Sequence, residues 1–137
     1  MIKQKLSAAL LALCLSTTVF GQPEDKKCIF ISTSHLDTQW NWNAQTTIEE
    51  YILNTMNQNY PLFEKYPDFQ FNFEGGIHYM WMKEYYPQEY EKLKKYIAED
   101  RWHISGGSIN ASDVMVPSAE SIIRNFLYGQ SYYKKEF

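Results

Sequence analysis

Three short stretches with strand-like patterns divide this chain, and a segment with helical spacing follows each of them. Residues 28–34 are continuously apolar at their centre, which predicts a strand buried on both faces. Residues 69–74 alternate strictly between aromatic and polar side chains, which predicts a second strand. Residues 101–105 precede a Gly-Gly pair and predict a short third strand.

Capping patterns and prolines predict where the helices begin and end. Residues 46–50, Thr-Thr-Ile-Glu-Glu, contain two overlapping capping boxes, so the first helix is expected to begin there. Pro61 is expected to end it, with a short further turn to about Tyr66. Two more helices are expected on either side of Pro87, and Ser118 is expected to cap a last one.

Apolar residues at helical spacing predict which side of each helix faces the core. After the second strand these residues are Ile77, Met80, Trp81 and Tyr85. In the last helix they are Ile122, Ile123, Phe126, Leu127 and Tyr133. Because strands and helices alternate, the chain is expected to have an α/β fold, with right-handed crossovers and helices outside a parallel sheet or barrel.

The first 21 residues differ in composition from the rest. Two lysines precede the apolar run of residues 6–15, and a small residue, Gly21, ends the segment. This layout is typical of a secretory signal peptide, and the run is too short for a membrane anchor. We therefore expect a signal peptide at residues 1–21, a polar linker at residues 22–27, and an exported protein, periplasmic or secreted, with no membrane span once the leader is removed.

Cysteine content limits how the fold can be stabilised, and net charge limits the possible partners. Cys14 follows Leu13 where a lipoprotein needs a small residue, so lipidation is not expected. Beyond the leader Cys28 is the single thiol, which excludes an internal disulfide and requires a packed core.

The formal net charge of -3 becomes more negative when the leader lysines are lost, which argues against nucleic acid or an anionic membrane as partner. The aromatic content of 17% fits either a heavily aromatic core or a sugar-binding surface.

Candidate chemistry appears where the first predicted strand ends. His35 and Asp37 are two positions apart, and residues i and i+2 of a strand project to the same side. An imidazole and a carboxylate would then converge on one point, as two ligands of a zinc ion do. Ligands in α/β folds bind at the C-terminal ends of the strands, which is where this pair is expected.

Other candidates are expected at the same end of the sheet. Trp40 offers a flat ring that could stack on a sugar, although a buried tryptophan is the commoner case. Asp113 lies in the loop after the third strand, where it either forms a turn or joins the site. Glu74 ends the second predicted strand and is expected to point to the same face, with a weaker indication of a site role than Asp113. His78 and His103 carry no motif and are expected at the surface or at the edge of the core.

Three stretches of the sequence, taken together, are typical of one protein family. They are residues 34–40, Ser-His-Leu-Asp-Thr-Gln-Trp; residues 66–69, Tyr-Pro-Asp-Phe; and Gly106-Gly107 followed by Asp113, Pro117-Ser118 and Glu120-Ser121. Together they resemble the N-terminal domain of α-mannosidases of glycoside hydrolase family 38, in order and spacing from about Cys28 to Phe137. The resemblance implies that residues 28–137 are the amino-terminal part of a seven-stranded β/α barrel of the glycoside hydrolase/deacetylase type.

The resemblance also implies an activity and roles for individual residues. It implies zinc-dependent hydrolysis of terminal α-linked mannose from oligosaccharides or glycans, with retention of configuration. His35 and Asp37 match zinc ligands, Trp40 matches an aromatic that lines the sugar site, and Asp113 keeps a substrate-binding place. In the loop after the third strand, Ile109 and Ala111 stand where many relatives have a tryptophan and a glutamate.

The catalytic carboxylates are expected outside these 137 residues. The resemblance implies that the nucleophile, the general acid and the remaining zinc ligands follow Phe137. No catalytic residue is therefore assigned, and the 137 residues alone are expected to be inactive. Two alternatives remain open: a metal-dependent carbohydrate deacetylase, whose Asp-Asp and His-x-x-x-His pairings this chain lacks, and a non-catalytic sugar-binding or vestigial fragment.

Overall fold

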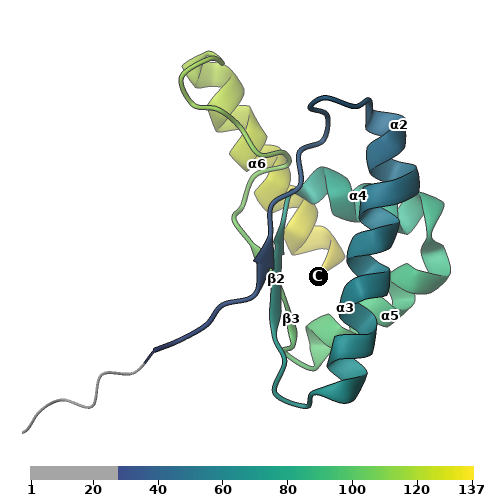
Figure 1. The fold of residues 1–137 in the computed structure, drawn as a ribbon. Coiled ribbons are helices and arrows are strands. Elements are labelled where there is room, and N and C mark those ends of the chain that lie inside the picture. The colour runs from purple at the N-terminus through teal and green to yellow at the C-terminus, as the bar shows by residue number, and fades with distance from the viewer. Residues whose placement is uncertain (1–27) are drawn as a thin grey trace, which may run out of the picture. The chain divides into compact units, whose positions relative to one another are not determined.

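Three parallel strands and the helices between them make up the structure, a computed structural model that describes residues 28–137. The expected signal peptide at residues 1–21 and linker at residues 22–27 lie outside the described residues. Within residues 31–137, which form one unit, strands and helices alternate as predicted. The strands are β1 (Thr33–Ser34), β2 (Phe71–Glu74) and β3 (Trp102–Ser105), in the sheet order β1-β2-β3 (Figure 1).

The first strand is shorter and more exposed than its apolar sequence predicted. β1 pairs with β2 through Thr33 and Ser34 alone, which lie opposite Asn72 and Phe73. In the described part of the chain the Ile31 side chain is 70% exposed. The prediction of a strand over residues 28–34 that is buried on both faces was therefore wrong.

A continuous helical segment follows β1. It consists of α2 (Ala44–Thr46), the π-helical η1 (Thr47–Ile52) and α3 (Leu53–Lys65). The side chain of Asn43 caps it by accepting a hydrogen bond from the N–H of Thr46 at 3.0 Å. Residues 46–50 therefore lie inside the helix, and the prediction that their capping boxes start it was wrong by about one turn.

Pro61 lies inside α3, so the prediction that it ends the helix was also wrong. A proline within a helix removes one backbone hydrogen bond. Its neighbours Tyr60 and Phe63 are buried, and the ring of Phe63 stacks on Tyr96 with centroids 4.4 Å apart. This packing holds the last turns of α3 against the core, and the helix continues to Lys65.

Two helices follow β2 as predicted, α4 (Gly76–Tyr85) and α5 (Pro87–Ala98). However, α4 buries a different side from the predicted one. Met80 and Tyr85 are exposed, whereas Tyr79 and Met82 are fully buried. The hydroxyl of Tyr79 donates to a β2 carbonyl at 2.8 Å and accepts from the indole N–H of Trp102 at 3.0 Å. Because its polar atom is paired, this tyrosine can lie in the core.

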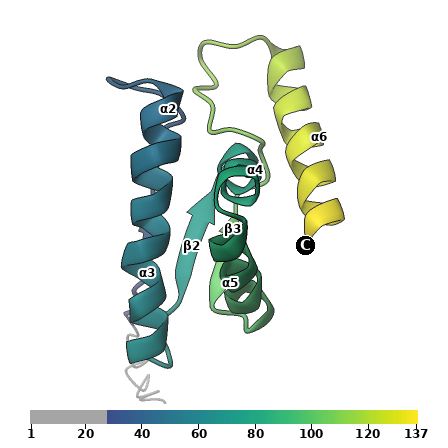
Figure 2. The same cartoon turned by 90° about the vertical axis from the view of Figure 1, so that its right-hand side faces the viewer.

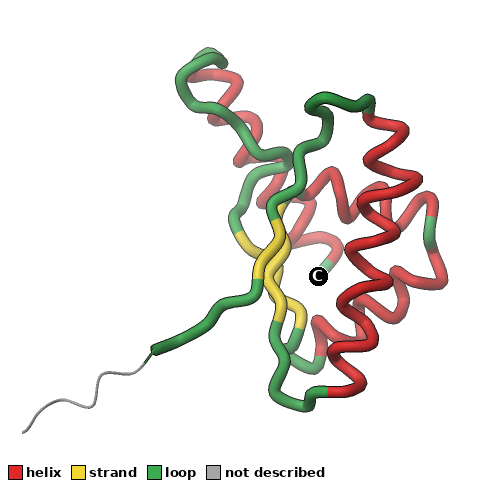
Figure 3. Tube along the Cα trace, viewed as in Figure 1, coloured by secondary structure: helices red, strands yellow, loops and turns green. Residues whose placement is uncertain are grey.

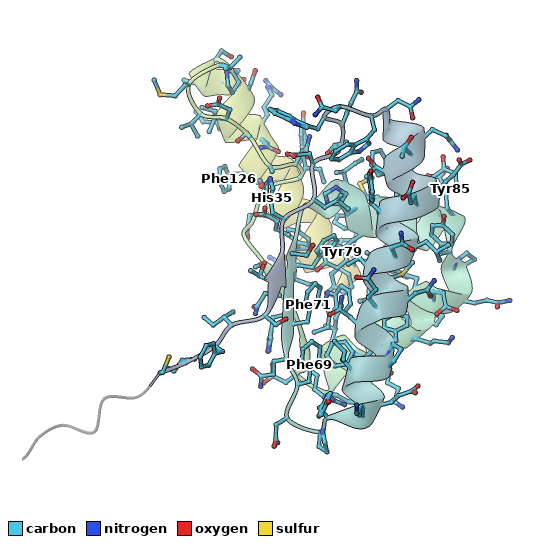
Figure 4. The ribbon with its side chains drawn as sticks, viewed as in Figure 1. His35, Phe69, Phe71, Tyr79, Tyr85 and Phe126 are labelled. Atoms are coloured by element: carbon cyan, nitrogen blue, oxygen red, sulfur yellow. The ribbon has the colours of Figure 1, made fainter. Side chains whose placement is uncertain are left out.

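The core lies between the sheet and helices α3, α4 and α5, which cover one face of it (Figures 1 and 2). The alternation in β2 produces this arrangement: Phe71 and Phe73 are buried, whereas Asn72 is only half-buried. Figure 4 shows Phe71 and Tyr79 on the helix-covered side of the sheet. Four buried aromatic rings, those of Tyr60, Phe63, Phe71 and Phe73, have centroids within 6.3 Å of the Trp102 ring. Much of the aromatic content therefore belongs to the core.

The last helix, α6 (Ala119–Glu136), begins at its predicted cap, where Ser118 accepts from the N–H of Ser121 at 3.2 Å. It approaches the loop after β3 at Gly129, where a Cβ atom would clash with the carbonyl oxygen of Gly107. The predicted apolar side is not buried over the first half of the helix in the described structure. Exposed there are Ile123, Phe126, Leu127 and Tyr128.

The fold class is thus α/β with a parallel sheet, in agreement with the prediction, while closure into a seven-stranded barrel remains a prediction. Between residues 28 and 137, the helices all lack the length and apolar character that a membrane span needs. The parallel strands place their C-terminal ends, and the loops that follow, at one edge of the sheet (Figure 3). His35, which follows β1, and Glu74, the last residue of β2, lie at this edge.

Candidate metal centre

The candidate site begins where β1 ends. His35 follows the last residue of β1 directly, and Asp37 is two positions further on. Figure 4 shows His35 at the C-terminal edge of the sheet. Nε2 of His35 lies 3.2 Å from Oδ1 of Asp37, and both side chains are open to solvent. The expected convergence of imidazole and carboxylate is therefore present in the structure.

The His35–Asp37 pair fits two ligands of one zinc ion. A tetrahedral zinc ion with nitrogen and oxygen ligands at about 2.0–2.1 Å keeps neighbouring donor atoms about 3.3 Å apart. The observed separation of 3.2 Å matches this value, and it also suits a direct hydrogen bond in the metal-free protein. Nitrogen and carboxylate oxygen are both accepted zinc donors.

The other nitrogen of His35 contacts a second carboxylate. Nδ1 lies 3.0 Å from Oε1 of Glu74, the last residue of β2. The hydrogen bond to Glu74 raises the pKa of His35 above its ordinary value; burial opposes this shift, and the charge of Asp37 adds to it. Glu74 and Asp37 face opposite nitrogens of the ring, so the three residues do not point at one spot. Accordingly, no group of three or more His, Cys, Asp or Glu residues is arranged to hold an ion within residues 28–137.

Beside Glu74, His78 is buried, contrary to the expectation of a residue at the surface or core edge. Burial lowers the pKa of His78, so the imidazole is neutral, and its Nδ1 lies 3.1 Å from the carbonyl oxygen of Glu74, to which it donates. The intervening Gly75 has φ of +88°, and a Cβ there would lie 2.6 Å from Nδ1 of His78. Only glycine adopts this turn at no steric cost while leaving room for the ring.

Hydrogen bonds on two sides hold the loop that carries Asp37. The carbonyl of Thr38 accepts from the hydroxyl of Thr47 at 2.8 Å, and that hydroxyl accepts from the indole N–H of Trp42 at 2.8 Å. The hydroxyl of Thr38 donates to the side chain of Asn110 in the loop after β3. Asn110 in turn exchanges two hydrogen bonds with Asn125 of α6, at 2.9 and 2.7 Å. The β1 loop is thus linked both to η1 and to α6.

The structure brings His35, Asp37 and Glu74 together and leaves the other candidates apart. Trp40 is 69% exposed, so its ring is free to contact a ligand. The carboxylate of Asp113 accepts a hydrogen bond from the N–H of Met115 at 2.9 Å, which is turn geometry. Within residues 28–137 no hydrogen bond or ion pair joins Asp113 to His35 or Asp37.

A pocket of about 410 Å³ opens between the end of β1 and the helix that follows it. Its lining is Ser34, His35, Leu36, Trp42, Tyr51, Asn54, Thr55 and Gln58. The lining contains more hydroxyl and amide groups than a typical apolar ligand pocket. Because His35 forms part of this lining, the candidate site continues into a concave, polar surface.

Comparison with known proteins identifies the family. The model of the glycosyl hydrolases family 38 N-terminal domain matches residues 25–137. The chain belongs to this family. The α/β fold with a parallel sheet is consistent with a family 38 N-terminal domain, the family that the sequence motifs indicated.

Three curated relatives carry mannosidase names. Alpha-mannosidase G of Dictyostelium discoideum is 35% identical over 103 residues, which are 75% of this chain and 9% of that protein. Alpha-mannosidase of Saccharomyces cerevisiae is 28% identical over 108 residues, 78% of this chain and 10% of that protein. Human Alpha-mannosidase 2C1 is 27% identical over 129 residues, 92% of this chain and 12% of that protein. The chain thus spans about a tenth of the length of these relatives.

Proposed function

We propose that the intact protein is a zinc-dependent α-mannosidase that hydrolyses terminal α-linked mannose from oligosaccharides or glycans with retention of configuration. Membership of family 38 and the names of the relatives support the glycosidase class and the mannose substrate. The observation that carries the proposal is the 3.2 Å approach of His35 and Asp37 at the C-terminal end of a parallel strand.

In this proposal His35 and Asp37 supply two of the ligands of a zinc ion. When bound, the ion would orient sugar hydroxyls and offset negative charge at the reacting centre. The Asp37 loop keeps its place through Thr38, which is bonded on two sides. The two ligands thus stay near one position before any ion or sugar binds, which reduces the ordering cost of binding.

Trp40 and Asp113 are proposed to bind the substrate. The exposed ring of Trp40 offers an apolar face of the size of a pyranose ring. Asp113 would accept hydrogen bonds from sugar hydroxyls, a role that requires its side chain to leave the turn with Met115. Retaining hydrolysis also needs a nucleophilic carboxylate and an acid about 5–5.5 Å apart. We assign neither role to a residue of this chain.

The proposal is tested by measuring metal content and hydrolysis of nitrophenyl α-mannoside with the intact protein. His35→Ala and Asp37→Ala are each expected to lose zinc and activity together, because each removes one ligand. His103→Ala is the matched control, since it removes a solvent-accessible histidine that lies on β3. Full zinc content in both ligand variants would contradict the metal assignment. Zinc-dependent release of acetate from an acetylated sugar, without release of mannose, would favour the deacetylase alternative instead.

Export is a separate proposal, and it is supported by the three-part composition of residues 1–21. Mass spectrometry of the mature protein is expected to give an N-terminus near Gln22. Replacing Leu10 by Arg interrupts the apolar run and should retain the unprocessed chain inside the cell. A mature protein that still begins at Met1 would contradict export through a cleaved leader.

A further inference from the structure

We propose that Glu74 is the positioning residue of His35: its carboxylate accepts a hydrogen bond from Nδ1 and so directs Nε2 towards the metal ion. This inference rests on the proposed zinc site. Neither the His-x-Asp motif nor the family match assigns a role to Glu74.

Each nitrogen of the His35 ring lies close to a different carboxylate. Nε2 lies 3.2 Å from Asp37, the other proposed ligand, and Nδ1 lies 3.0 Å from Glu74. A neutral imidazole carries one proton, and only the nitrogen without it can bind a metal ion. A carboxylate at Nδ1 keeps the proton there, fixes the rotation of the ring and raises the basicity of Nε2.

Glu74 is itself held by the sheet, which suits a positioning role. It ends β2 and pairs with Ser105 of β3. Its carbonyl oxygen accepts from Nδ1 of the buried His78 at 3.1 Å. The carboxylate therefore projects from fixed backbone, and among residues 28–137 it forms its ion pair with His35.

A second histidine–carboxylate pair in the same chain lacks these features and provides a control. Nδ1 of His103 lies 3.5 Å from Asp100, whose side chain is 93% exposed. Asp100 has φ of +56°, a conformation that asparagine tolerates well, so Asp100→Asn removes a charge beside a histidine without backbone strain. Any effect of charge removal in general should appear in this variant too.

The first test measures the dissociation constant of zinc alone, by competition with a chromophoric chelator, in the intact protein. Glu74→Ala is expected to bind zinc 10- to 100-fold more weakly, the usual effect of losing such a partner. Glu74→Gln keeps an acceptor oxygen and should fall between wild type and Glu74→Ala. Asp100→Asn should bind zinc like the wild type. Circular dichroism of each variant verifies folding.

The second test identifies the protonated nitrogen directly, first in the wild type and then in Glu74→Gln. Nitrogen-15 chemical shifts of His35 in the zinc-loaded wild type should show the proton on Nδ1 and the metal on Nε2. In Glu74→Gln the Nδ1 proton should exchange faster with water, because a neutral acceptor holds it less strongly. A purely structural role of Glu74 would not alter this signal.

The outcomes separate this inference from the function on which it rests. If His35→Ala removes zinc but Glu74→Ala and Glu74→Gln bind it as tightly as wild type, Glu74 has no positioning role while the zinc site stands. A proton on Nε2 and metal on Nδ1 would also overturn the inference. If His35→Ala itself binds zinc normally, the zinc site fails and the inference fails with it.

Discussion

Exposure separates the residues of the candidate site that can meet a ligand from those that hold the backbone. His35, Asp37 and Trp40 are open to solvent, whereas His78 is 1% exposed. The neutral, buried His78 ring can only donate from one nitrogen, and it does so to the carbonyl of Glu74. The open side chains are therefore the ones available to a ligand, whereas His78 of α4 holds the backbone at the end of β2.

Trp40→Ala tests the role of the exposed ring. If the indole stacks on the sugar, its removal should raise KM about 2- to 12-fold, because such contacts contribute about 0.5–1.5 kcal/mol. Zinc content should stay unchanged, since the indole is no ligand. Steady-state kinetics of the intact protein on nitrophenyl α-mannoside measure the effect.

The control for this prediction is Tyr85→Ala, which removes an exposed aromatic from the end of α4. It should leave KM within twofold of wild type. An equal rise of KM in both variants would mean that loss of aromatic surface in general, and not stacking at the site, produced the change.

The sequence could predict the local part of the site but not the contact made across strands. The i, i+2 spacing of His35 and Asp37 is enough to bring them together at the end of a strand. The contact with Glu74 depends on the register Ser34↔Phe73 between β1 and β2. Local patterns do not determine a register between strands that are separated by a long crossover helix. Glu74 could therefore be placed at the correct edge, but not against His35.

At the scale of elements, the predicted helix boundaries were wrong where tertiary contacts outweigh the local conformational preference of the residues. The threonines of residues 46–50 have good capping patterns, yet Thr47 is buried. Its hydroxyl donates to the carbonyl of Thr38 and accepts from the indole N–H of Trp42. Pro61 is a strong helix-breaking signal, yet the packing of its neighbours holds the helix. The strand β2 and the start of α6 were predicted correctly, since aromatic alternation and a serine cap act locally.

Asn43→Ala tests the observed cap. The variant should lower the free energy of unfolding by about 1 kcal/mol, because the N–H of Thr46 loses its side-chain acceptor. Glu50→Ala changes a residue of the expected capping box, and its free energy of unfolding should differ by less than about 0.5 kcal/mol, the usual range for an exposed position. Urea unfolding of the intact protein compares the two. A larger loss in Glu50→Ala would restore the capping-box interpretation.

The end of α6 carries a pH-dependent contribution to stability. Nζ of Lys83 on α4 lies 2.7 Å from both carboxylate oxygens of Glu136, and this hydrogen bond lowers the pKa of Glu136 below its ordinary value of 4.5. A carboxyl group whose pKa is lowered by folding stabilises the native state above its unfolded pKa. The contribution is lost as the pH falls below about 4.5 through the lowered pKa.

Glu136→Gln should therefore be less stable than wild type at pH 7, and the difference should shrink as the solution is acidified. Urea unfolding at a series of pH values measures it. Glu120→Gln is the control, because its ion pair with Arg124 is solvent-exposed on both sides and should contribute little at any pH. A difference that grew on acidification would contradict the assigned direction of the pKa shift.

At the scale of the whole molecule, the apolar surface is unevenly distributed. One face of the sheet is covered by α3, α4 and α5, while the first half of α6 leaves large apolar side chains exposed, with Ile123 at 62% and Leu127 at 56%. Residues 114–116, Val-Met-Val, lie in the preceding loop and are exposed too. Exposed apolar patches of this kind are interaction surfaces or sites of aggregation.

We expect residues 22–137, expressed by themselves, to aggregate and to show no hydrolysis of nitrophenyl α-mannoside with added zinc. Edge strands of the described three-stranded sheet present unpaired backbone groups, and the exposed side of α6 adds apolar area. Replacing Ile123 and Leu127 by lysine should reduce light scattering, whereas the same change at the already exposed Glu120 should not. Size-exclusion chromatography with light scattering measures the outcome. A monodisperse wild-type sample with cooperative unfolding would show that this surface needs no cover, and turnover by it would show that the catalytic carboxylates lie within these residues.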